Sequence, residues 1–157
     1  MKIRQARLPV GIDQFEKLRE GGYYYVDKTE LIEQVIEEGC EVTLFTRPRR
    51  FGKTLNMSMV ETFFSSDYAE RGDLFEGLSI WTEEKYQKLQ GTYPVISLSF
   101  ARVKETNYED TRERICQIIR NLYIKFSFLK DSGVLEKADK AYYERILADT
   151  VSNADLT

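Results

Sequence analysis

The sequence of 157 residues contains no histidine and only two cysteines, Cys40 and Cys116. Without histidine there is no catalytic triad that uses an imidazole base, and two distant cysteines outside a CxxC pair do not make a zinc site. So few cysteines also exclude a disulfide framework, and we expect a reducing compartment, the cytoplasm.

Long apolar runs and an excess of basic charge are also missing. No stretch approaches the roughly 20 apolar residues that span a bilayer, and the N-terminal MKIRQARLPVGIDQF lacks the apolar core of a signal peptide. We therefore expect no membrane insertion. With 23 basic and 26 acidic side chains, the chain as a whole is not suited to polyanions. Its hydrophobic content of 42% is typical of one folded domain.

Apolar periodicity predicts a series of helices and two strong strands. One helix is expected near residues 12–20, and a second, capped by Asp27 or Thr29, ends at Gly39. Three more are expected from Lys53 to Ser65, from Asn107 to a break at Ser132-Gly133, and at about 134–148. The strands are expected at 42–46 and 93–99. These elements predict an α/β, P-loop NTPase-like fold with a mainly parallel sheet and flanking helices. The sheet would be incomplete, since such domains normally have about five strands or more.

The triplet Gly52-Lys53-Thr54 is the end of the phosphate-binding pattern G-x-x-x-x-G-K-[ST]. A G-K-[ST] triplet alone is weak, but this one follows a predicted strand and a loop and begins an apolar helix. Helix-start N–H groups bind phosphate, and Gly52 lets the backbone approach closely. Lys53 would then reach the β- and γ-phosphates, and Thr54 would offer its hydroxyl to Mg²⁺.

Local charge supports this interpretation. Residues 30–41 hold five glutamates and no base, whereas residues 47–53 hold four bases and no acid. One departure from the pattern stands at Arg47, which occupies the position of the first glycine, and Pro48 is expected to fix that turn instead. The alternative explanation is that the GKT triplet begins the helix by coincidence and that the arginines only form a solvated loop.

Four stretches resemble the bacterial AAA-ATPase-like family: LPVG at residues 8–11, YYVDKT at 24–29, LFTRPRRFGKTLNMSM at 44–59, and YPVISLSF at 93–100. The similarity covers most of the chain, and RPRRFGKT is its most specific part. The resemblance implies ATP binding with Mg²⁺. The nucleotide-binding residues would be Arg47, Pro48, Arg49, Arg50, Phe51, Gly52, Lys53, Thr54 and Leu55, with Thr54 reaching Mg²⁺.

Longer family members carry a PD-(D/E)XK nuclease-like domain, which with the Walker B segment would lie beyond Thr157. The resemblance thus implies that residues 1–157 are the N-terminal part of a longer P-loop domain, and that nucleic acid is a partner only through the missing part. We expect residues 152–157 to fray. The strand at 95–100 ends without an acid, and Glu105 is a weak metal ligand candidate, so we expect binding without hydrolysis.

Other interpretations stay open. Arg49 and Arg50 could contact phosphates or a partner's carboxylates, or be solvated. Tyr23, Tyr24 and Tyr25 could stack on adenine, although strand packing is favoured. Asp27-Lys28-Thr29 is interpreted first as a helix cap. The alternatives for the whole chain are a degenerate P-loop scaffold or interaction domain, or a nucleic-acid-associated module. An open sheet edge would also predict self-association.

Overall fold

The computed structural model describes residues 7–48 and 50–148. It divides into two compact units, Met1–Val95 and Ile96–Thr157, which we describe separately. No helix in the described ranges is both long enough and apolar enough to cross a membrane.

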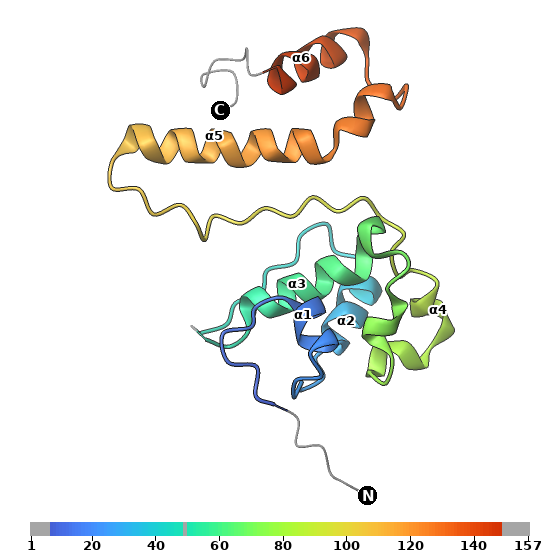
Figure 1. The fold of residues 1–157 in the computed structure, drawn as a ribbon. Coiled ribbons are helices and arrows are strands. Elements are labelled where there is room, and N and C mark those ends of the chain that lie inside the picture. The colour runs from blue at the N-terminus through green and yellow to red at the C-terminus, as the bar shows by residue number, and fades with distance from the viewer. Residues whose placement is uncertain (1–6, 49, 149–157) are drawn as a thin grey trace, which may run out of the picture. The chain divides into compact units, whose positions relative to one another are not determined.

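The first unit is built from short helices around α3 (Figure 1). Its α-helices are α1 (Phe15–Glu20), α2 (Glu30–Glu38), α3 (Lys53–Phe64) and α4 (Glu84–Gln87), and its 3₁₀ helices are η1 (Ser66–Tyr68), η2 (Gly72–Phe75) and η3 (Ser79–Thr82). The helix α2 ends at Gly39, which adopts the left-handed conformation that favours glycine.

Three aromatic rings organise the core of this unit. Phe75 stacks on Phe15 with ring centroids 5.1 Å apart and meets the edge of Phe63 at 5.2 Å. Buried aliphatic side chains from the surrounding helices complete the cluster, namely Ile32, Met59, Leu74, Leu78 and Ile80. Because Met59 and Phe63 project from α3 into this cluster, packing fixes the helix that follows the GKT triplet.

The second unit contains α5 (Tyr108–Lys125), η4 (Ser127–Asp131) and α6 (Lys137–Leu147). The Asn107 side chain accepts a hydrogen bond from the backbone N–H of Asp110 at 2.8 Å and so caps α5. The Tyr143 hydroxyl on α6 donates to the Tyr123 carbonyl on α5 at 2.7 Å, which joins the two helices.

The helices expected from periodicity are confirmed, with α1, α2, α3, α5 and α6 at the predicted places. The predicted loop at 47–52 also contains no helix or strand in its described residues. The frayed tail predicted at 152–157 lies outside the described residues.

The prediction of a mainly parallel sheet is wrong. The described residues are mostly helical and form no sheet, and both expected strands, 42–46 and 93–99, run as coil apart from the bridge at Tyr93 (Figure 1). Pairing is confined to isolated parallel bridges, Arg7 with Tyr23 and Ser65 with Tyr93. Because the described residues form no sheet, they offer no open sheet edge that would support self-association.

The physical reason is that apolar, β-branched composition favours extended backbone but does not supply a hydrogen-bonding partner. A parallel strand is stable when neighbours pair with it and helices cover both faces. Here the side chains of Val42 and Leu44 are 84% and 81% exposed. The run at 42–46 is therefore neither paired nor covered within the described residues.

Candidate functional site

The loop before α3 contains two residues with left-handed backbone. Arg50 has φ of 67° and Gly52 has φ of 74°. Glycine adopts this conformation without strain, whereas an arginine there costs on the order of 1 kcal/mol. The chain thus turns sharply just before the helix starts, and at Arg50 it adopts a left-handed conformation that arginine does not favour.

The first turn of α3 leaves backbone donors available. The N–H of Asn56 donates to the Gly52 carbonyl at 2.8 Å and begins the helical pattern. The N–H groups of Lys53, Thr54 and Leu55 make no hydrogen bond to a described residue, and Gly52 provides no side-chain cap. Such donors, at the positive end of the helix dipole, attract an anion.

The side chains of this turn divide into exposed and packed ones. Lys53 and Thr54 are exposed and have no side-chain hydrogen bond or ion pair with any described residue, whereas Leu55 packs against the core. Leu55 therefore anchors the turn, and the cation and hydroxyl of its neighbours stay available.

The other residues predicted for the site, apart from Leu55, precede this turn in the sequence. Arg47, Pro48, Arg50 and Phe51 are all exposed, and the exposed fraction of Phe51 is 61%. Arg49 lies outside the described residues. The loop thus presents arginine and lysine side chains without a carboxylate among them.

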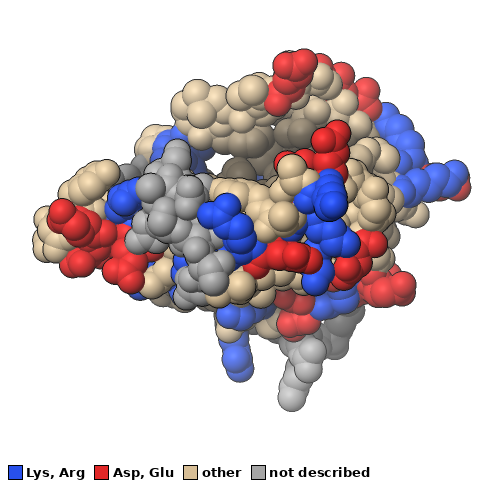
Figure 2. Space-filling model, turned by 90° about the horizontal axis from the view of Figure 1, so that it is seen from above, with Lys and Arg blue, Asp and Glu red and all other residues tan. Residues whose placement is uncertain are grey.

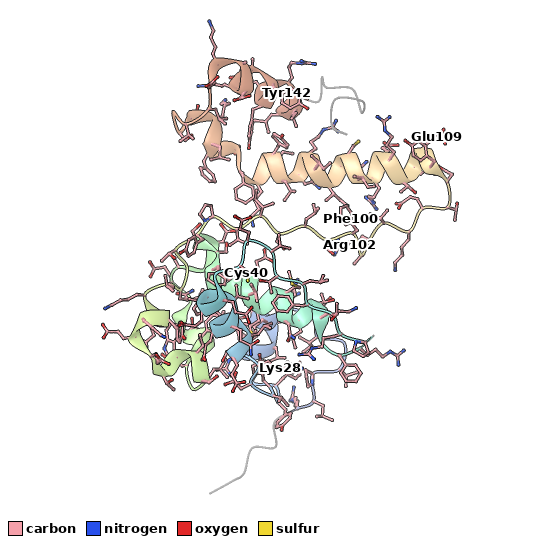
Figure 3. The ribbon with its side chains drawn as sticks, turned by 180° about the vertical axis from the view of Figure 1, so that it is seen from behind. Lys28, Cys40, Phe100, Arg102, Glu109 and Tyr142 are labelled. Carbon is pink, nitrogen blue, oxygen red and sulfur yellow. The ribbon has the colours of Figure 1, made fainter. Side chains whose placement is uncertain are left out.

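A further lysine reaches the loop from a separate segment. A Cβ atom at position 52 would lie 3.7 Å from Nζ of Lys28 and 3.9 Å from Oδ1 of Asn56. Figure 3 shows Lys28 at the side of the first unit where α3 begins. The residues around Lys28 indicated a helix cap, and a role near the nucleotide followed from the family resemblance alone, because a contact between residues 28 and 52 depends on tertiary packing.

The neighbours of Lys28 do serve as local anchors. Oδ1 of Asp27 accepts hydrogen bonds from the N–H and hydroxyl of Thr29 at 2.9 and 2.7 Å, and its Oδ2 accepts one from the N–H of Ser79 at 2.7 Å. Desolvation raises the pKa of this carboxyl, but these hydrogen bonds outweigh it and hold the pKa below its ordinary value. Asp27 therefore does more than cap a helix, because its carboxylate also links the start of α2 to η3.

Two other candidate residues, Tyr25 and Glu105, already have contacts within the protein. The Tyr25 ring packs against Phe15 at 5.5 Å, its hydroxyl contacts Met59, and burial raises its pKa to about 12. In the second unit, the Glu105 carboxylate pairs with Arg114 at 3.3 Å and accepts the N–H of Lys104 at 2.7 Å. Tyr25 is thus a core residue, and Glu105 is already engaged.

Charged side chains also lie on the surface outside the loop. Figure 2 shows Lys and Arg side chains interspersed with Asp and Glu side chains on the face it displays. The second unit holds a mainly apolar pocket of about 390 Å³ between α5 and α6, with Asp139 and Tyr142 on its wall. Among the described residues no group of three or more potential metal ligands is found.

Comparison with known proteins adds sequence relationships to this geometry. A family model for AAA-ATPase-like proteins, described as predicted AAA-ATPase, matches residues 9–155. An uncharacterized protein in the vnfD 5′ region of Azotobacter chroococcum mcd 1 is 35% identical over 118 residues, which are 74% of this chain and 21% of that protein. The chain thus spans about a fifth of this relative, and no solved structure matches it.

Proposed function

The chain belongs to the AAA-ATPase-like family, and from this premise we propose that residues 47–55 bind the phosphates of ATP as a Walker A-type loop. The observation that carries the proposal is the set of available donors at the start of α3. The backbone N–H groups of the first turn, the Lys53 ammonium and the Thr54 hydroxyl have no partner among the described residues. They follow a glycine in the left-handed conformation.

Each group has a distinct part in the proposed binding. The N–H groups donate hydrogen bonds to phosphate oxygens, and the absence of a side chain at Gly52 lets the phosphates approach the backbone. Lys53 supplies a positive charge that reaches the β- and γ-phosphates. The arginines of the loop add charge around them.

Magnesium fits this arrangement through Thr54. Its hydroxyl lies in the first turn of α3, is exposed, and has no hydrogen bond to a described residue. Hard cations such as Mg²⁺ take oxygen ligands and are usually held by a few protein groups together with phosphates. The metal supplies charge neutralisation on the phosphates, and Thr54 is the residue of this loop that would hold it.

The first experiment is a thermal-shift series with ATP, ADP, GTP and sulfate, with and without Mg²⁺. We expect ATP to raise the melting temperature, because a ligand that binds only the folded state stabilises it. No shift with any nucleotide would contradict the proposal and would favour a scaffold or interaction domain.

The second experiment assigns the binding to the loop. Lys53→Ala should weaken ATP binding about tenfold or more, because it removes a charge-assisted hydrogen bond. Lys88→Gln is the matched control, since Lys88 lies at the end of α4 and pairs only with Glu84 there. Equal ATP affinity of Lys53→Ala and the wild type in calorimetry would remove Lys53 from the site.

A further inference from the structure

The ammonium group of Lys28 occupies a position beside Gly52 that no local motif explains. It comes from the segment before α2, yet its Nζ lies 3.7 Å from where a Cβ of residue 52 would be. Gly52 is the residue that leads into α3 and the proposed phosphate site. Lys28 is thus brought to this site from outside the 47–55 loop.

The backbone of Lys28 is held on both sides. Asp27 accepts three hydrogen bonds, from Thr29 and from the N–H of Ser79. Thr29 is fully buried, and its hydroxyl oxygen lies 2.8 Å from that of Ser79 and accepts the N–H of Ile80 at 3.2 Å. Two anchored neighbours reduce the conformational freedom of residue 28, so the lysine is presented at the loop by a fixed backbone.

The charge of Lys28 has no compensating partner. Its ammonium makes no hydrogen bond or ion pair with a described residue. By contrast, Arg71 of the same unit pairs with Glu16 at 2.7 Å and Lys85 pairs with Glu37 at 2.8 Å. An unpaired lysine beside Gly52 adds positive charge to a loop that already holds Arg50 and Lys53, and a polyanion would compensate that charge.

We propose that Lys28 contacts the phosphate chain and makes the site selective for nucleotides with a long, highly charged phosphate chain. This inference rests on the proposed function, since it adds a residue to the same site. Each further phosphate increases the negative charge of the ligand, so a second lysine favours ATP over AMP. Lys28 is thus a phosphate-contacting residue and a determinant of specificity.

The test measures the affinities of the chain for ATP and AMP by competition against a fluorescent ATP analogue at low salt. Lys28→Gln should weaken ATP binding about tenfold and AMP binding less than about twofold. Lys28→Arg should restore most of the preference, because it keeps the charge. Lys88→Gln removes one lysine charge at the end of α4, outside the 47–55 loop, and should change neither affinity.

The ratio of the two affinities separates this role from a structural one. A lysine that only supports the loop would change ATP and AMP binding in parallel. Lys28→Met keeps the aliphatic stem and should give the same loss of preference, so it replaces Lys28→Gln if that variant does not fold.

The failures of the two proposals are distinguishable. If the wild type binds ATP through Lys53, but the ATP-to-AMP ratio is unchanged in Lys28→Gln or Lys28→Met, the assignment of Lys28 is overturned and the proposed function stands. If the wild type binds no nucleotide, the proposed function is overturned and Lys28 loses its ligand with it.

Discussion

The carboxylate of Asp27 accepts a hydrogen bond of 2.7 Å from the backbone N–H of Ser79, 52 residues further along the chain. This bond connects the segment that presents Lys28 to η3. The same carboxylate accepts the N–H of Thr29 at the start of α2. Asp27 therefore holds two segments of the first unit together, and its substitution should lower the free energy of unfolding.

Asp27→Asn should lower the free energy of unfolding by about 1 to 2 kcal/mol at neutral pH, because a carboxylate acceptor of two backbone N–H groups is lost. The measurement is urea unfolding. Asp13→Asn is the control, since Asp13 is exposed and makes no hydrogen bond to a described residue. That control should stay within about 0.5 kcal/mol of the wild type.

The effect of Asp27 should depend on pH. Hydrogen bonds lower its pKa in the folded state, so ionised Asp27 stabilises the protein above its unfolded pKa of about 3.9. That stabilisation is lost as the pH falls through the lower folded pKa. The difference between wild type and Asp27→Asn should therefore be full at pH 6 and shrink below about pH 4. A difference that does not change with pH would contradict this role of the charge.

Gly52→Ala should weaken ATP binding about tenfold and lower stability by about 1 kcal/mol. The strain arises because residue 52 has a positive φ, and the new methyl group would stand between the phosphate site and Lys28. Gly39→Ala provides the comparison, since Gly39 also has a positive φ but faces open space. It should cost similar stability and leave ATP affinity unchanged. If Gly52→Ala and Gly39→Ala lost ATP affinity equally, the loss in Gly52→Ala would follow from lower stability and not from a contact in the site.

Gly91→Ala should be the most disruptive glycine substitution in the described part of the chain. A Cβ there would overlap Cα of Ala69 and lie 2.9 Å from its nitrogen, and φ is +69°. The N–H of Gly91 also donates to the Phe63 carbonyl at 2.8 Å, so the backbone has little room to move. We expect a loss of about 3 kcal/mol or more. Gly77→Ala, with a similar φ but open space around the position, should lose only about 1 kcal/mol, and urea unfolding of both variants measures the difference.

Local rules predicted the ends of helices well, because those rules concern residues close in sequence. Asn107 caps α5 through Asp110, and Gly39 ends α2. Whether a sheet forms could not be predicted in the same way, since the apolar run at 42–46 carries no information about a pairing partner, and the predicted sheet is absent from the described residues. The position of Lys28 beside Gly52 could not be derived from local rules for the same reason, and only the family resemblance allowed a role of this segment near the nucleotide. It follows from how the anchored segment at 27–29 packs against the start of α3.

Self-association remains a prediction, now argued from exposed apolar side chains. Val42 and Leu44 are among the most exposed large hydrophobic side chains of the described residues, and such neighbours recruit other apolar surfaces. Sedimentation velocity at high concentration should show species larger than a monomer, and Val42→Lys/Leu44→Lys should reduce them. Val134→Lys changes a similarly exposed but isolated valine and should have no effect. A monomeric wild type would contradict the prediction.

The last prediction is that this chain binds ATP without appreciable hydrolysis. In-line attack on the γ-phosphate needs a metal held by the loop hydroxyl and by an acid on a neighbouring strand, with a group that positions the water. The segment at 95–100 forms no strand and carries no acid.

The nearest acid after that segment, Glu105, is paired with Arg114. Lys53 and Thr54 would then orient phosphates without a second protein anchor for the metal. Phosphate release by the wild type should therefore equal that of Lys53→Ala, and both should stay far below the typical enzyme range of about 1 to 1,000 per second. Turnover above about 0.1 per second that disappears in Lys53→Ala would show that an acid of this chain, or of a second copy, completes the site.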